Sequence, residues 1–115
     1  MLQTENNQLL HELNACAIVS NMCYYFSLHG KDVTVTTRCI ELSRDCADLC
    51  QLASSMLGRG TKEITSILKI CAKLCIECAD ECENFDEEHY QKCARVCRKC
   101  AEMCELFQPE LVKPN

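Results

Sequence analysis

The stretch CARVCRKCAEMC at residues 93–104 places four cysteines at successive spacings of four, three and four residues. At 3.6 residues per helical turn, these steps keep the other three side chains within about 40° of the first on a helix. Ala, Arg, Lys, Glu and Met fill most positions between the cysteines, and all five are good helix formers. The stretch therefore predicts a helix with one narrow stripe of thiols.

The same spacing recurs three times upstream. The stretch at 71–82 repeats it in full, whereas the stretches at 39–50 and 16–27 repeat it with gaps. Serine, which is close to cysteine in shape, stands at every gap: Ser20, Ser27 and Ser43. Thirteen cysteines and three serines thus fill a grid of sixteen positions, four on each segment.

The cysteines on these four stripes are the candidate metal ligands. One or two buried cysteines act as small apolar residues, but each cysteine in place of leucine forgoes roughly 1 kcal/mol of burial. A core built from thirteen of them needs something bound to it. The candidates are Cys16, Cys23, Cys39, Cys46, Cys50, Cys71, Cys75, Cys78, Cys82, Cys93, Cys97, Cys100 and Cys104.

Three short segments, HGKD (29–32), GRGT (58–61) and NFDEEH (84–89), separate the cysteine stripes. Gly30 suits a left-handed position after the first helix, and the β-branched run at 33–37 is expected to be the fraying start of the second. With only three glycines and two prolines in 115 residues, a loop-rich fold is disfavoured. The sequence predicts an all-α, antiparallel up-down-up-down four-helix bundle with a cysteine-lined core. The expected divisions are helices at about 5–29, 34–57, 62–83 and 87–107, a single domain over 1–108, and a C-terminal tail over 109–115.

Antiparallel packing of the four stripes predicts four layers across the bundle. Three of these layers would each contain one serine, and the fourth would contain cysteine alone. From the end nearest residue 30, the expected layers are Ser27, Cys39, Cys82 and Cys93; Cys23, Ser43, Cys78 and Cys97; Ser20, Cys46, Cys75 and Cys100; and Cys16, Cys50, Cys71 and Cys104.

The composition excludes several classes of function. The net charge of −5 and the absence of a basic run argue against nucleic-acid binding. No secretory signal and no apolar stretch of about 18 residues are visible, so a cytoplasmic protein without a membrane span is expected. A reducing cytoplasm keeps thiols free, and an odd number of cysteines is also poorly suited to full disulfide pairing.

Thiolates select Cu(I), zinc and iron–sulfur clusters. Two sulfurs about 4.5 Å apart can hold one ion between them, and Cu(I) accepts low coordination with thiolates that bridge successive ions. Zinc prefers separate tetrahedral sites, and only the last expected layer offers four thiols. The run at 93–104 lacks the short spacings and the proline of a ferredoxin loop. Multiple Cu(I) ions, on the order of ten, are therefore the expected cargo.

Two alternatives stay open on the residues alone: an iron–sulfur electron carrier with a cluster inside the bundle, and a metal-free thiol redox buffer. No enzyme activity is expected. The two C-x-x-C matches, at 75–78 and 97–100, follow from the stripe spacing, and no βαβ pattern accompanies them. No catalytic Ser/His/Asp set or phosphate-binding glycine loop is recognisable.

The two ends of the expected bundle differ. His29 and His89 lie in the two hairpin loops at one end, where they are candidate transient ligands through which copper enters. An ordinary apolar plug is expected at the other end, formed by Leu9, Leu10, Leu13, Leu52, Met56, Leu57, Ile64, Ile67, Leu68, Leu106 and Phe107.

The sequence resembles the cytosolic copper storage proteins, which are cysteine-lined four-helix bundles of bacteria. RCIELSRDCADLC (38–50), CAKLCIECADEC (71–82) and HYQKCARVCRKCAEMC (89–104) carry the resemblance. It implies storage of many Cu(I) ions by the cysteines inside each bundle and assembly of the bundles into a homo-tetramer. A copper chaperone or a low-molecular-weight thiol is the candidate delivery partner.

This sequence departs from the family pattern at several places. Leu9, Leu13, Ser20 and Ser27 occupy first-helix positions where the family usually has more cysteine. Tyr90 stands where a further cysteine can occur, and the loop at 84–89 has only one histidine where relatives can be histidine-rich. Because serine does not replace thiolate for Cu(I), the layers that contain serine are expected to bind less copper.

Overall fold

The computed structural model describes residues 2–108, and within them it contains four α-helices and no β-strand. The helices are α1 (Leu2–Leu28), α2 (Thr37–Arg59), α3 (Ile64–Cys82) and α4 (Glu88–Glu105). The predicted all-α four-helix bundle is therefore confirmed. The predicted tail at 109–115 lies outside the described residues.

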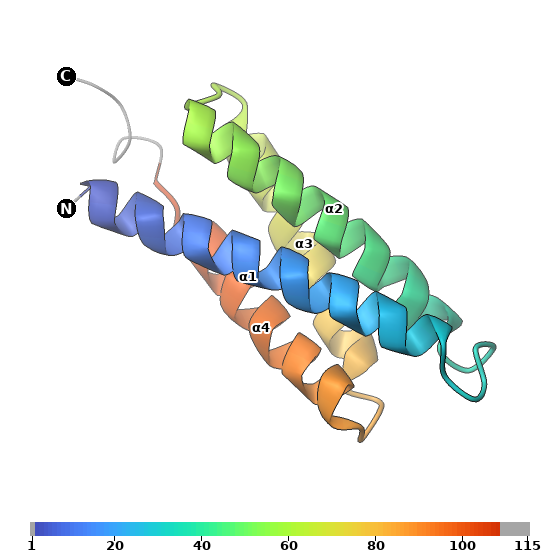
Figure 1. Ribbon diagram of the computed structural model, residues 1–115. Helices are drawn as coiled ribbons and strands as arrows, with labels where there is room; N and C mark the ends of the chain where they lie inside the picture. Colours follow the sequence, from blue (N-terminus) through green and yellow to red (C-terminus); the bar gives the residue numbers. More distant parts are fainter. Residues whose placement is uncertain (1, 109–115) are drawn as a thin grey trace.

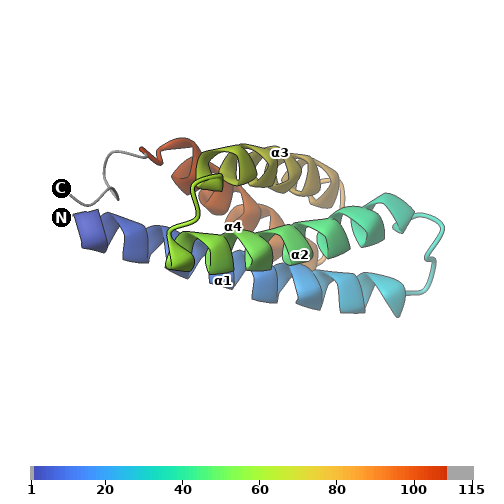
Figure 2. The ribbon, with the colours of Figure 1, turned by 90° about the horizontal axis from the view of Figure 1, so that it is seen from above.

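Each helix runs antiparallel to its neighbour in the chain (Figures 1 and 2). α1 packs against α2 and α4, and α3 packs against the same two helices. We call the end with the α1–α2 and α3–α4 connections the loop end, and the end with the α2–α3 connection the plug end (Figure 1). No helix in the described part of the chain is both long and apolar enough to span a bilayer.

Buried alanines flank the cysteine stripes and let the helices approach closely. Ala47 and Ala53 of α2 and Ala79 of α3 are fully buried, and Ala94 and Ala101 of α4 are nearly so. Small side chains beside the thiols bring the four helix axes together around the stripes. The interior is therefore narrow and lined by sulfur.

The apolar plug is present, but it is smaller than predicted. Leu9, Leu13, Leu57, Ile64 and Leu68 are buried. Leu52 and Leu106, which the prediction also placed in the plug, face solvent with exposed fractions of 46% and 64%. The plug is thus formed mainly by α1 and α3 with the end of α2.

The start of α2 differs from the prediction. Residues 33–36 form turns and the helix begins at Thr37, because Asp32 accepts hydrogen bonds from the backbone N–H and hydroxyl of Thr34 and organises a separate turn. The expected left-handed Gly30 is also wrong. Among the described residues, Gly60 is the one glycine with positive φ, at 72°.

Gly60 ends α2 through a regular capping motif. Its N–H donates to the carbonyl of Leu57 at 3.1 Å, and the N–H of Thr61 donates to the carbonyl of Met56 at 3.0 Å. This pattern requires a left-handed residue after the helix, which glycine adopts without steric cost. The GRGT segment therefore turns the chain into α3 as expected from the sequence.

A guanidinium on α4 joins the α3–α4 hairpin at the surface. Arg98 donates two hydrogen bonds to Glu83, at 2.8 and 2.7 Å, and one to Asp80 at 2.7 Å. The hydrogen bond from Arg98 also lowers the pKa of the Glu83 carboxyl. This exposed bidentate pair links α4 to the end of α3 in the register at which their cysteine stripes face each other.

Candidate metal centre

All thirteen cysteines are buried, and none forms a disulfide. Twelve of them have exposed fractions of 0–1%, whereas Cys104 has an exposed fraction of 6%. The predicted stripe of buried cysteines is present on every helix, because the four-three-four spacing turns each thiol toward the bundle axis.

The sulfurs gather into four groups in which all sulfur atoms lie within 4.8 Å of one another. Two groups have four thiols and two have three. The groups are Cys16, Cys46, Cys50 and Cys75; Cys50, Cys71, Cys75 and Cys100; Cys23, Cys82 and Cys93; and Cys46, Cys78 and Cys97. Cys39 and Cys104 are the two cysteines outside these groups.

The spacing of the sulfurs suits a soft monovalent ion. The Sγ atoms of Cys46 and Cys75 are 3.5 Å apart, as are those of Cys50 and Cys71, and the Sγ atoms of Cys16 and Cys97 are 3.7 Å apart. Three sulfurs placed about 2.3 Å from one ion in a plane lie roughly 4.0 Å from each other. The groups can therefore accept trigonal ions after small side-chain rotations.

The predicted register between α2, α3 and α4 agrees with the structure. Cys46 meets Cys75 and Cys50 meets Cys71, as the antiparallel layers require. The pairs Cys82 with Cys93, Cys78 with Cys97 and Cys75 with Cys100 also lie within common groups.

The predicted register of α1 is wrong by one layer. Cys16 lies 3.8 Å from Cys46 and from Cys75 instead of joining Cys71 and Cys104, and Cys23 lies 3.9 Å from Cys82. The displacement of α1 moves every thiol of that helix toward the loop end.

Tyr90 faces the displaced helix at the loop end. It lies three residues before Cys93, so it extends the stripe of α4 by one step, and it is almost fully buried. Its ring packs against Phe85 with centroids 4.8 Å apart. Burial raises the pKa of the Tyr90 phenol, and contact with the Ser27 hydroxyl partly offsets this rise. Ser27 thus faces Tyr90 in a layer beyond the outermost cysteines.

The three serines are fully buried at the expected grid positions. The Ser20 hydroxyl oxygen is 3.8 Å from the sulfurs of Cys16 and Cys97. The Ser43 hydroxyl donates instead to the backbone carbonyl of Cys39. The Ser20 hydroxyl therefore takes the place of a thiol beside Cys16 and Cys97, whereas the Ser43 hydroxyl is bonded to its own helix.

Close packing couples the ionisation of the thiols in the Cys23, Cys82 and Cys93 group. Hydrogen bonds from Cys23 and other thiols lower the pKa of Cys93. The hydrogen bond with Cys82 lowers the pKa of Cys23, but proximity to Cys93 and burial together raise it to about 12. Neighbouring thiols, Cys100 first, likewise raise the pKa of Cys75. A cation that binds several of these sulfurs must therefore displace protons.

The two loop-end histidines lie outside the thiol groups. His29 is exposed, and its Nδ1 is 2.8 Å from the carbonyl oxygen of Tyr25. The ring of His89 packs between Phe26 and Tyr90, with centroid distances of 4.9 and 4.1 Å, and its Nε2 is buried without a hydrogen-bond partner. Tyr90 thus lies between His89 and the outermost thiols, a position that its spacing from Cys93 could have indicated.

Residues 2–109 match the family model described as copper storage protein. The chain belongs to the copper storage protein family. The cysteine stripes that suggested this family are the elements that line the bundle.

Individual relatives are similar to this protein over most of the chain. The cysteine-rich protein YhjQ of Bacillus subtilis is 35% identical over 76 residues, which are 66% of this chain and 70% of YhjQ. The Cu(I)-bound copper storage protein BsCsp3 superposes with a TM-score of 0.84 at 31% identity, over 88% of this chain and 95% of its own. A cytosolic copper storage protein from Streptomyces lividans with five coppers gives a TM-score of 0.86 at 30% identity, over 96% and 94% of the two chains.

Proposed function

We propose that this protein binds and stores multiple Cu(I) ions through thiolates inside its own bundle, in a storage or detoxification role rather than a catalytic one. The four overlapping groups of buried, unbridged thiols are the observation that carries the proposal. All thirteen cysteines are proposed ligands, with Cys39 and Cys104 completing the ends of the array.

Overlap between the groups favours bridged ions over separate sites. Cys50 and Cys75 each belong to both groups of four, and Cys46 belongs to one group of four and one group of three. A thiolate shared by two groups can bridge two Cu(I) ions, so the number of ions can approach the number of sulfurs. This sharing supports a capacity on the order of ten ions.

Anaerobic Cu(I) titration followed by native mass spectrometry tests the proposal. We expect filling to a stoichiometry on the order of ten, accompanied by proton release. A stoichiometry of zero or one contradicts storage. Strong visible absorption after anaerobic purification favours an iron–sulfur carrier instead, and reversible disulfides with weak Cu(I) retention favour a thiol redox buffer.

Copper is proposed to enter at the loop end past His29 and His89. The buried and unpartnered Nε2 of His89, close to Tyr90, supports this route. The variant His29→Ala/His89→Ala is expected to load Cu(I) more slowly, with an unchanged final stoichiometry. His11→Ala is the matched control, because His11 is exposed near the plug end. Equal loading rates for all three proteins contradict the route.

The proposed setting is the cytoplasm, with a copper chaperone or a low-molecular-weight thiol as the delivery partner and a homo-tetramer as the assembly. Ile18, Met22 and Tyr25 form an exposed apolar line along α1, with exposed fractions of 61%, 45% and 56%. Such a line supports packing against a second copy. Sedimentation analysis of the wild type and Met22→Glu tests it, and a monomeric wild type contradicts the tetramer.

A further inference from the structure

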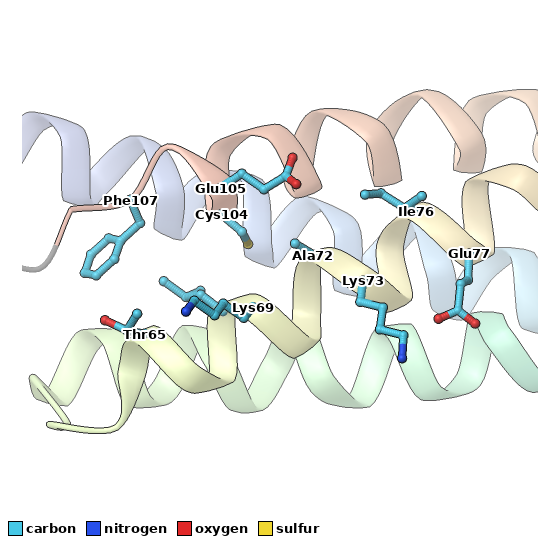
Figure 3. Close-up of a pocket in the computed structure, with 10 residues that line it drawn as sticks. Thr65, Lys69, Ala72, Lys73, Ile76, Glu77, Cys104, Glu105 and Phe107 are labelled. Carbon is cyan, nitrogen blue, oxygen red and sulfur yellow. The ribbon is translucent and has the colours of Figure 1, made fainter.

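A groove lies between α3 and the end of α4. It has a volume of about 640 Å³ and opens to solvent. Figure 3 shows the Cys104 sulfur directed from α4 toward the α3 side of this groove. The volume is within the range of sites that hold small organic molecules.

Cys104 connects this groove to the thiol array. It is the most exposed of the thirteen cysteines, at 6% against 0–1% for the others. Cys104 lies outside the four thiol groups, but Cys100 and Cys71 are near enough to raise the pKa of its thiol, and both belong to a group of four. Cys104 therefore stands between the thiol array and the solvent that fills this groove.

The groove is lined by both charged and apolar side chains. Lys69 and Lys73 of α3 are exposed, and among the described residues neither ammonium has a carboxylate within ion-pair distance. Of the two acidic residues in the lining, Glu77 is already paired with Arg38 at 3.6 Å. Figure 3 places Phe107 at one end of the lining, beyond Cys104. The free ammonium groups favour a ligand with carboxylates, and Glu105 can accept an amino group of the same ligand.

We infer that this groove binds a small peptide-like thiol with carboxylates, which exchanges Cu(I) with Cys104. The inference rests on the proposed storage function and adds a partner class and a place for transfer. In the exchange, the incoming thiol loses its proton as its sulfur binds Cu(I), and the Cys104 thiolate takes up a proton as it leaves the ion. Copper stays in the +1 state, so the step needs no oxidant or reductant.

The test uses the full chain loaded with Cu(I) under anaerobic conditions and glutathione as the probe thiol. The rate of copper loss is followed by native mass spectrometry for the wild type and for Lys69→Glu/Lys73→Glu. We expect the variant to lose copper to glutathione roughly tenfold more slowly at low ionic strength, because the carboxylates of the probe are repelled. Copper loss to the neutral thiol 2-mercaptoethanol is expected at the wild-type rate.

Lys31→Glu/Lys92→Glu is the matched control, because it changes the net charge equally at exposed positions outside the groove. An unchanged rate with glutathione in the groove variant overturns the inference. Equal slowing in the control, or equal slowing with 2-mercaptoethanol, also overturns it. A change of oligomeric state in the groove variant would instead identify the groove as a subunit interface. Failure of the wild type to hold copper at all would refute the storage function, which the initial loading reveals separately.

Discussion

Ser20 shows how one oxygen atom in place of sulfur removes a ligand from the thiol array. Its hydroxyl oxygen lies 3.8 Å from the sulfurs of Cys16 and Cys97, which are themselves 3.7 Å apart, so a thiol there would complete a group of three. A neutral hydroxyl is a poor ligand for Cu(I), which prefers soft sulfur donors. The Ser20 side chain is nevertheless small and buried, so a cysteine at this position would direct its sulfur into the array.

Replacing this serine by cysteine is therefore expected to increase capacity. Ser20→Cys should bind about one more Cu(I) ion than the wild type in an anaerobic titration, because its sulfur would join those of Cys16 and Cys97. Ser20→Ala is the matched control and should bind as many ions as the wild type. A lower stoichiometry for Ser20→Ala would mean that the hydroxyl itself takes part in binding.

At the scale of the helices, the spacing within a stripe was enough to predict which face is buried. The steps of four, three and four determine the direction of every thiol relative to its helix axis, and all thirteen are buried. The pairing of α2, α3 and α4 followed from short connections between stripes of equal length.

The register of α1 could not be obtained in this way. Its stripe contains Ser27, and no spacing rule says whether that serine faces Cys93 or the residue one step beyond it. In the structure Ser27 contacts Tyr90, one step beyond Cys93, and both side chains are buried. The start of α2 was misplaced for a similar reason, since the Asp32 turn competes locally with helix formation.

The end of α2 offers a matched pair of glycine substitutions. Gly60 has a φ of 72°, and an added Cβ there meets no atom within 4 Å, so Gly60→Ala carries a purely conformational cost. We expect a loss of about 1 kcal/mol in the free energy of unfolding of the copper-free protein. Gly58 lies inside α2 with equally open surroundings, so Gly58→Ala is expected to raise stability by about 0.5 kcal/mol.

Urea denaturation followed by circular dichroism measures both effects. The two variants differ only in the backbone conformation of the substituted residue. Changes of opposite sign in the free energy of unfolding are therefore the decisive result. Destabilisation of equal size at both positions would show that α2 ends differently in solution.

At the scale of the whole molecule, the thiol-lined core makes stability depend on protonation. The pKa of Cys23 rises from its ordinary 9.0 to about 12 in the folded chain. Below pH 9.0 this thiol is protonated whether the chain is folded or unfolded, and its contribution to stability is complete. As the pH rises toward 12, the unfolded chain releases the proton more readily than the folded one. The contribution of Cys23 is therefore lost progressively between pH 9.0 and about 12.

The copper-free protein should accordingly unfold more easily at high pH, and Cys23 should account for part of that loss. We expect a decrease of about 2 kcal/mol from this one group between pH 9 and about pH 10.5, measured by urea denaturation under reducing, anaerobic conditions. Cys23→Ser removes the titrating thiol, so its free energy of unfolding should fall less steeply over the same range. Identical slopes for the two proteins would mean that Cys23 ionises as readily inside the bundle as in the unfolded chain. The expected result, a steeper slope for the wild type, would show that protonation of the closely packed thiols stabilises the copper-free bundle.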